Sequence, residues 1–185
     1  MAKYRKDQRQ PYVLFGEGPT EELFLSLIKQ LYSKELSEKF IKIGNGSGGS
    51  PGSVLLNLEK TILSIGDPFI PTLVLIDEDN GLDDEARKFL KRHTDKRGIC
   101  SIRVVFSKPQ CLEGFLLDLL DDPLPPNKQT SNNLKLYFYD KYLGEKDHVQ
   151  RNFKAKRGKL FSRKLLEDKK VTSSTLAEIY QFLGL

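Results

Sequence analysis

The chain alternates between short, largely apolar segments and longer segments whose apolar residues recur at helical spacing. The apolar segments cover residues 12–15, 39–43, 71–79 and 99–107, and their lengths are typical of strands. Residues 71–79 contain the run LVLI, as expected of a parallel strand that is buried on both faces. Because helical segments separate the strands, the order predicts an α/β fold with a mostly parallel four-stranded sheet and helices on both faces.

The intervening segments have the apolar stripes of amphipathic helices. Pro19 suits the first position of the first helix, and Ser53 can cap the second. A polar third helix is expected at roughly 83–96, and a fourth follows the last strand. The stripes of the first, second and fourth helices are Leu23, Phe24, Leu27, Ile28 and Leu31; Val54, Leu55, Leu58, Ile62 and Ile65; and Leu112, Phe115, Leu116, Leu119 and Leu120.

After Asp122 the pattern changes. The run PLPPNKQTSNN cannot hold regular structure, and the residues beyond it are helical in pattern, basic and without a convincing strand. We therefore expect a sheet domain at residues 1–122 and a small basic helical appendage, packed on that domain, at residues 123–185.

The positive charge is concentrated in the C-terminal part. The 185-residue chain has a formal net charge of +5, and residues 146–170 contain ten Lys or Arg against three acidic residues. Such a segment can neutralise the phosphates of DNA or RNA, although a charged helix face is often only solvated surface. The candidates for nucleic-acid binding are Lys154, Lys156, Arg157, Lys159, Arg163 and Lys164.

Several classes of protein are disfavoured. No apolar run approaches the roughly 20 residues of a membrane helix, and the N-terminus lacks the apolar core of a signal peptide, so we expect a cytoplasmic protein without a membrane partner. Cys100 and Cys111 form no CxxC pair. His93 and His148 share no metal-ligand spacing and are expected on the surface.

Acidic residues follow three of the four predicted strands. Glu17 ends the first strand, Asp77 and Asp79 end the third, and Glu113 lies just beyond the fourth. Glu21 lies one helical turn after Glu17. If the chain stays extended, Asp77 and Asp79 point to the same face. Because the carboxyl ends of parallel strands share one edge of a sheet, we expect these side chains to converge.

A divalent cation would relieve the repulsion within such a group of carboxylates. Mg²⁺ or Mn²⁺ prefers oxygen ligands, and a pair of such ions can activate the cleavage of a phosphodiester. The glycines beside Glu17 would let a phosphate approach closely. The structural alternatives are that Glu21 and Glu113 only favour helix starts, and that Asp77 and Asp79 only belong to a turn.

Three motifs resemble a known family. The GEG around Glu17 and the IDED containing Asp77 and Asp79 are similar to the signature of Toprim domains, the fold of topoisomerases, primases and a set of nucleases. More narrowly, FGEGPTEELF, VLIDEDNG and SKPQCLEGFLL together resemble the small RloB-like branch, which is related to the OLD nucleases. The resemblance covers roughly residues 12–120.

The resemblance implies a role for each motif residue. It assigns Glu17 as metal ligand or general base, Asp77 and Asp79 as metal ligands, and Glu21 and Glu113 as supplementary ligands. Lys108 is a candidate for contacting the phosphate, with an exposed loop lysine as the alternative. It also implies a separate ATPase partner, in the setting of prokaryotic defence, such as phage defence, or of a mobile element.

Together these patterns predict a metal-dependent phosphodiester-cleaving nuclease that acts on DNA or RNA. The alternative is a non-catalytic regulatory subunit that binds an ATPase partner or nucleic acid. A dinucleotide site is disfavoured because Glu21 replaces the third glycine of the fingerprint. The sequence leaves open the choice between DNA and RNA, and whether the chain forms a homo-oligomer.

Overall fold

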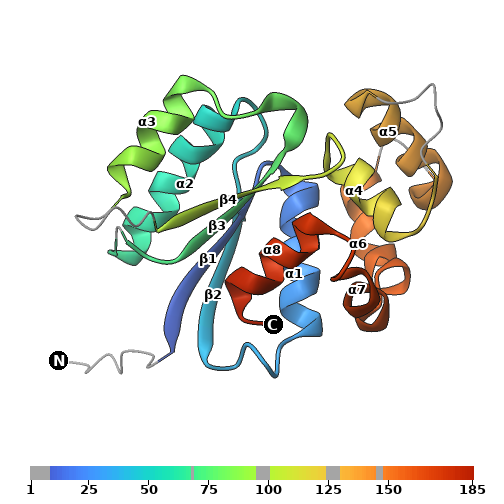
Figure 1. The fold of residues 1–185 in the computed structure, drawn as a ribbon, viewed down its shortest axis with the longest axis horizontal. Helices are drawn as coiled ribbons and strands as arrows, with labels where there is room; N and C mark the ends of the chain where they lie inside the picture. Colours follow the sequence, from blue (N-terminus) through green and yellow to red (C-terminus); the bar gives the residue numbers. More distant parts are fainter. Residues whose placement is uncertain (1–8, 68, 95–100, 124–129, 145–147) are drawn as a thin grey trace.

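The chain is built around one four-stranded sheet (Figure 1). The computed structural model describes residues 9–67, 69–94, 101–123, 130–144 and 148–185. The strands lie in the order β2-β1-β3-β4, and every neighbouring pair is parallel. This confirms the predicted α/β class. The strands are β1 (Gln10–Gly16), β2 (Lys39–Asn45), β3 (Thr72–Asp77) and β4 (Ile102–Ser107).

Helices connect the strands and continue beyond the last one. The α-helices are α1 (Pro19–Leu31), α2 (Pro51–Ile65), α3 (Asp84–Arg92), α4 (Leu112–Leu119), α5 (Ser131–Phe138), α6 (Val149–Leu160), α7 (Arg163–Lys169) and α8 (Ser174–Leu183). A 3₁₀ turn, η1 (Glu78–Asn80), follows β3, and a π-helical turn, η2 (Tyr139–Leu143), continues α5.

Two details of the helices differ from the predictions. The cap of α2 is Ser50 rather than Ser53, since Ser50 Oγ accepts the Ser53 N–H at 3.3 Å and Pro51 takes the first helical position. Helix α3 ends at Arg92, and residues 95 and 96 of the predicted span lie outside the described residues.

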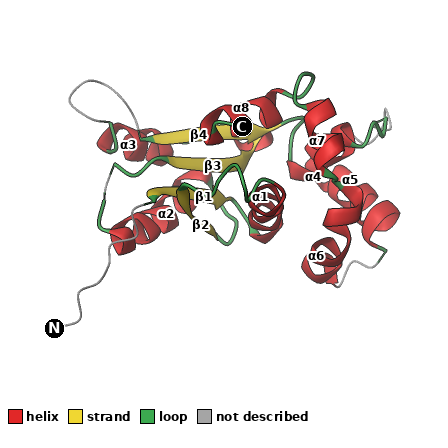
Figure 2. Cartoon of the chain, turned by 90° about the horizontal axis from the view of Figure 1, so that it is seen from below, coloured by secondary structure: helices red, strands yellow, loops and turns green. Residues whose placement is uncertain are grey.

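Helices cover both faces of the sheet (Figure 2). Val13 and Phe15 of β1 face α2 and α3, within a cluster that also holds Leu58 and Phe89. Leu14 faces the opposite side, because successive strand residues point to opposite faces. That side carries α1 and α8.

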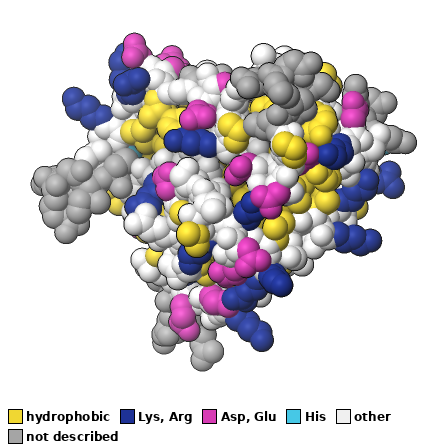
Figure 3. Space-filling model, turned by 45° about the vertical axis from the view of Figure 1, so that its right-hand side comes forward, with side chains coloured by type: hydrophobic (Ala, Val, Ile, Leu, Met, Phe, Trp, Pro, Cys, Tyr) yellow, Lys and Arg dark blue, Asp and Glu magenta, His cyan; other side chains and the backbone are white. Residues whose placement is uncertain are grey.

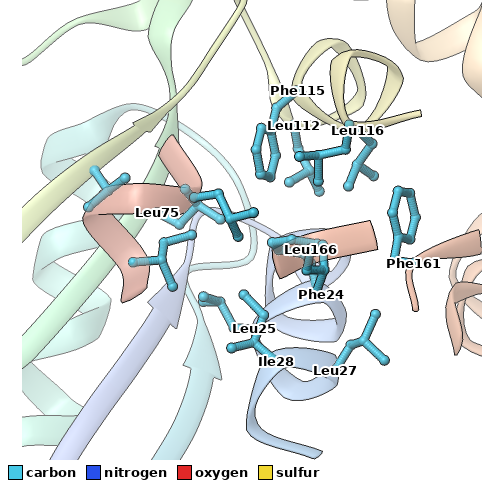
Figure 4. Close-up of a cluster of buried hydrophobic side chains, with 14 of the residues drawn as sticks. Phe24, Leu25, Leu27, Ile28, Leu75, Leu112, Phe115, Leu116, Phe161 and Leu166 are labelled. Atoms are coloured by element: carbon cyan, nitrogen blue, oxygen red, sulfur yellow. The ribbon is translucent and has the colours of Figure 1, made fainter. Parts of the chain in front are cut away.

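The larger core lies on the α1 side and extends into the C-terminal helices. Phe24 contacts Phe115 and Phe161 edge to face, with ring centroids 5.4 and 6.2 Å apart (Figure 4). The same cluster holds residues of α4, α5, α6, α7 and α8. Residues before and after position 122 therefore share one hydrophobic core. The helices that follow this position pack against α1 and α4 in that core.

Two further observations concern the surface. None of the helices within the described ranges is long and apolar enough to span a bilayer.

The prediction that His93 is a surface residue is wrong: its side chain is buried, its Nδ1 lies 3.1 Å from the Phe89 carbonyl, and its ring stacks on Phe89.

Candidate active site

A pocket of about 180 Å³ opens at the carboxyl ends of β1 and β3. These neighbouring strands are parallel, so the residues that follow them meet at one edge of the sheet. The pocket brings together four of the five predicted acids, and we call it the carboxylate pocket. Its lining consists of Glu17, Gly18, Pro19, Thr20, Glu21, Gly48, Asp77, Glu113, Lys135 and Tyr139.

Asp77, the last residue of β3, is buried and held from both of its oxygens. Its Oδ1 accepts hydrogen bonds from Ser107 Oγ at 3.1 Å and from the Leu112 N–H at 2.9 Å. Its Oδ2 lies 3.2 Å from the ammonium of Lys135, which comes from α5. The carboxylate therefore has a fixed orientation, and one cationic partner is already present.

Glu17 follows β1 and extends the sheet pattern by one residue. Its N–H donates to the Leu75 carbonyl at 2.9 Å, and its Oε2 accepts the Asp77 N–H at 3.0 Å. The Gly48 N–H donates to the Glu17 carbonyl at 2.8 Å, which brings the glycine-rich loop beside the pocket. Burial raises the pKa of the Glu17 carboxyl, with the hydrogen bond from Asp77 opposing the shift.

Glu21 lies in the first turn of α1 and is almost fully buried. Its Oε2 accepts the Gly18 N–H at 2.9 Å and so caps the start of the helix. Burial, followed by the negative charges of Asp77 and Glu113, raises the pKa of Glu21 to about 8. Both the capping role and the pocket location of this residue are therefore real features of the structure.

Glu113, in the first turn of α4, carries an unsatisfied buried oxygen. Its Oε1 accepts the Tyr139 hydroxyl at 2.7 Å, whereas its Oε2 is buried and has no hydrogen-bond partner within the part of the chain that the structure describes. Burial raises the pKa of the Glu113 carboxyl, and the Tyr139 hydrogen bond opposes that shift. Buried polar oxygens in folded proteins nearly always have a partner, so this one indicates a missing ligand or proton.

Asp79 does not join the pocket, and the expectation that it shares a face with Asp77 is wrong. The chain turns into η1 directly after Asp77 instead of staying extended. The Asp79 N–H donates to the Gln110 carbonyl at 3.0 Å, and Asp79 Oδ2 accepts the Ser131 hydroxyl. Asp79 is exposed beside the pocket rather than lining it.

Lys108 also lies outside the pocket lining. Its ammonium is 3.8 Å from Glu78 Oε1, and its side chain is about half exposed. This placement matches the structural alternative of an exposed loop lysine. The cation that does line the pocket is Lys135.

The glycines beside Glu17 have a packing reason. A Cβ on Gly16 would lie 2.5 Å from Glu21 Cβ and 2.8 Å from the Glu22 backbone nitrogen. Gly18 is the N-cap residue of α1 and has an extended backbone. These glycines let α1 start tightly against the end of β1, which places Glu21 next to Glu17.

Two pocket residues were missed by the sequence analysis, and both come from the C-terminal segment. Lys135 and Tyr139 are four residues apart, a spacing that places side chains on one side of a helix. The carboxylates of Asp77 and Glu113 raise the pKa of Lys135 in spite of its burial, so it stays charged at neutral pH. Burial and the charge of Glu113 raise the pKa of Tyr139, so it stays a hydrogen-bond donor.

The six predicted nucleic-acid-binding residues have different environments. Arg157 is buried and donates to the Leu23 carbonyl, and Lys156 donates to the carbonyls of Tyr142 and Leu143. Arg163 lies 2.5 Å from Glu35. The exposed residues without a partner among the described residues are Lys154, Lys159 and Lys164.

Lys and Arg side chains on this side of the molecule are spread among Asp and Glu (Figure 3). No face that consists of Lys and Arg alone is visible in this view. Binding of a polyanion would therefore depend on particular residues rather than on the net charge of the segment.

The donor set of the pocket suits a hard divalent cation. Within the described ranges, no three Asp, Glu, His or Cys side chains are arranged as a ready metal site. All candidate ligands are nevertheless carboxylate oxygens, and the buried Glu113 Oε2 has no partner. Burial raises the pKa values of Glu17, Glu21 and Glu113, so it is costly to ionise all of these carboxyl groups without added positive charge. A cation would supply it.

No family model, curated protein or solved structure matches this chain. The resemblance to Toprim domains therefore rests on the sequence motifs around Glu17, Asp77 and Glu113.

Proposed function

We propose that the protein is a metal-dependent nuclease that cleaves phosphodiesters of DNA or RNA with Mg²⁺ or Mn²⁺. The observation that carries the proposal is the meeting of Glu17, Glu21, Asp77 and Glu113 in one pocket at the strand ends. With all four carboxyl groups ionised, the single ammonium of Lys135 would leave the site net negative, and this favours the binding of a divalent cation over a structural role for every acid.

Glu113 and Glu21 are the side chains with most capacity to hold a cation. Among the described residues, Glu113 Oε2 has no partner, and Glu21 Oε2 accepts the Gly18 N–H alone. When bound, a divalent cation lowers the pKa of a bound water and compensates the charge that develops on the phosphate.

The other pocket residues are suited to orient the substrate, to accept a proton and to compensate negative charge. Asp77 is held by Ser107, Leu112 and Lys135, so it defines where a cation or substrate can approach. Glu17 has a raised pKa beside the pocket and is suited to accept a proton from an attacking water. The charged Lys135 ammonium is suited to compensate a phosphate oxygen.

The ion pair between Lys135 and Asp77 favours a second candidate, a non-catalytic regulatory subunit. In that case the resident ammonium already serves as the counter-ion, and the pocket holds the C-terminal helices in place. A separate ATPase partner and a role in prokaryotic defence or a mobile element are compatible with either candidate and rest on the motif resemblance.

A cleavage assay separates the two candidates. Purified protein is incubated with supercoiled plasmid, linear duplex, single-stranded DNA and structured RNA, with Mg²⁺, Mn²⁺ or EDTA. The nuclease proposal expects cutting that requires the metal and falls at least about a hundredfold in Glu17→Gln. Glu38→Gln is the matched control, because Glu38 is exposed and precedes β2, at the other end of the sheet.

The fold of each variant is checked by circular dichroism. If no substrate is cut, the same panel is repeated with a candidate ATPase partner. If no substrate is cut with or without the ATPase partner, or if Glu17→Gln cuts as well as the wild type, the regulatory subunit is the better account.

A further inference from the structure

A second hollow lies next to the carboxylate pocket, between the start of α1 and the first turns of α6. Its volume is about 330 Å³, and we call it the α1–α6 groove. Pro19 lines both the groove and the carboxylate pocket, so the two are adjacent at the start of α1. The groove is lined by Pro19, Glu22, Leu23, Gln150, Arg151 and Lys154.

Contacts between α1 and α6 fix the two helices that line the groove. Arg157 of α6 donates to the carbonyl of Leu23 in α1, and Phe153 is buried in the core beside Phe161. These contacts fix α6 against α1. The shape of the groove is therefore set by the packing of these two helices.

The groove has two cations with no competing partner. Arg151 and Lys154 are exposed, and neither has an ion pair or hydrogen bond among the described residues. Their spacing of three residues places them on one side of α6. By contrast, the predicted contacts Lys156, Arg157 and Arg163 already bind protein groups.

We propose that the α1–α6 groove binds the phosphate backbone of a single nucleic-acid strand and leads it to the carboxylate pocket. This inference rests on the proposed function and adds the path of the substrate to it. Arg151 and Lys154, which have no partner among the described residues, can neutralise neighbouring phosphates, and a strand bound there would lie next to the carboxylate pocket, because Pro19 lines both hollows.

Glu22 sets the side on which the backbone lies. It lines the groove opposite the two cations, and it accepts a hydrogen bond from the Asn45 amide. Its charge repels phosphates, so the strand lies against α6. Replacing Glu22 by Gln keeps an acceptor for Asn45 and removes the repulsion, and it should tighten binding about two- to fivefold.

Binding in the absence of metal tests the groove separately from catalysis. Fluorescence anisotropy is measured in EDTA with fluorescein-labelled oligothymidylate and oligouridylate. The test variant is Arg151→Gln with Lys154→Gln, and the matched control is Lys159→Gln with Lys164→Gln. The control removes the same charge from exposed residues of α6 and α7 that lie outside the groove.

We expect the groove variant to bind at least about tenfold more weakly and the control to stay within about twofold of the wild type. The slope of log affinity against log salt should become shallower by about 1.4 for the loss of two phosphate contacts. Equal losses in both variants would reduce the effect to net charge and overturn the proposal. The absence of wild-type binding to both oligonucleotides would also overturn it.

The two proposals fail in different ways. If the groove variant loses binding while the wild type cuts nothing with metal, the nuclease proposal fails and the groove stands as a binding site. If metal-dependent cutting occurs and the groove variant binds and cuts like the wild type, the nuclease proposal stands and the proposed role of the groove is wrong.

Discussion

The ammonium of Lys135 lies 3.2 Å from Asp77 Oδ2, although 58 residues separate the two in the chain. Asp77 ends a central strand, whereas Lys135 belongs to a helix of the C-terminal segment. The ion pair closes the carboxylate pocket with a group that the sheet itself does not provide. The C-terminal helices are thus part of the candidate site, and this has consequences for stability and metal binding.

Lys135→Met should destabilise the metal-free protein by about 1–2 kcal/mol. Removing one partner of a buried pair typically costs about 3–5 kcal/mol, but the Lys135 side chain is 36% exposed and solvent reduces the effect. Urea unfolding in EDTA measures the change. Lys135→Arg keeps the charge and should lose less.

The same variant should gain more stability from Mn²⁺ than the wild type does, because the cation no longer competes with an ammonium at Asp77. An unchanged or smaller gain from Mn²⁺ would contradict this account of Lys135.

Tyr139→Phe should cost about 1–2 kcal/mol, because both oxygens of the buried Glu113 would then lack a donor. In the background of Glu113→Gln the same change should cost less, since a neutral amide is less costly to bury. A double-mutant cycle by chemical denaturation measures this coupling. Additive losses would show that the hydrogen bond does not position Glu113.

Gly16→Ala should destabilise the fold by about 2 kcal/mol or more, because its Cβ would lie 2.5 Å from Glu21 Cβ at the start of α1. Gly158→Ala is the matched control within α6, where a Cβ meets no atom within 4 Å. That control should stabilise the protein by about 0.5–1 kcal/mol. Thermal denaturation of both variants tests the pair, and a tolerated Gly16→Ala would remove the packing explanation.

The metal-free protein should become less stable as the pH rises from about 5 to about 8. The pKa of Glu21 is 4.5 when unperturbed and about 8 in the folded chain, so the folded state binds more protons across this window. The raised pKa values of Glu17 and Glu113 act in the same direction.

The expected loss from Glu21 is on the order of 2–4 kcal/mol. Urea unfolding in EDTA at several pH values measures it, and Glu21→Gln should remove most of the slope. A stability that rises through this window in the wild type would disprove the buried, protonated state of Glu21.

The sheet was predictable because hydrophobic spacing largely determines where strands form. The boundaries were less so: β1 starts at Gln10, ahead of the apolar run, because its backbone pairing with Lys39 continues beyond the buried residues. The direction of the chain after Asp77 could not be predicted. It depends on Gln110, whose carbonyl accepts the Asp79 N–H and whose N–H donates to Glu78 Oε2 at 3.2 Å.

The C-terminal contribution to the pocket was beyond sequence reasoning for a different reason. The spacing of Lys135 and Tyr139 shows that they share a side of a helix, but not what that side meets. The burial of Leu134 and Phe138 in the core turns this side toward Asp77 and Glu113. That burial depends on helices α4 and α6, which are assembled only in the folded chain.

The most direct test of the central claim is a thermal-shift titration with Mn²⁺ on the wild type, the double variant of Glu17→Gln and Glu113→Gln, and Glu38→Gln. If the carboxylate pocket binds a divalent cation, millimolar Mn²⁺ raises the melting temperature of the wild type and of Glu38→Gln, and it raises that of the double variant much less. No shift in the wild type, or the same shift in all three proteins, would contradict a metal site in this pocket.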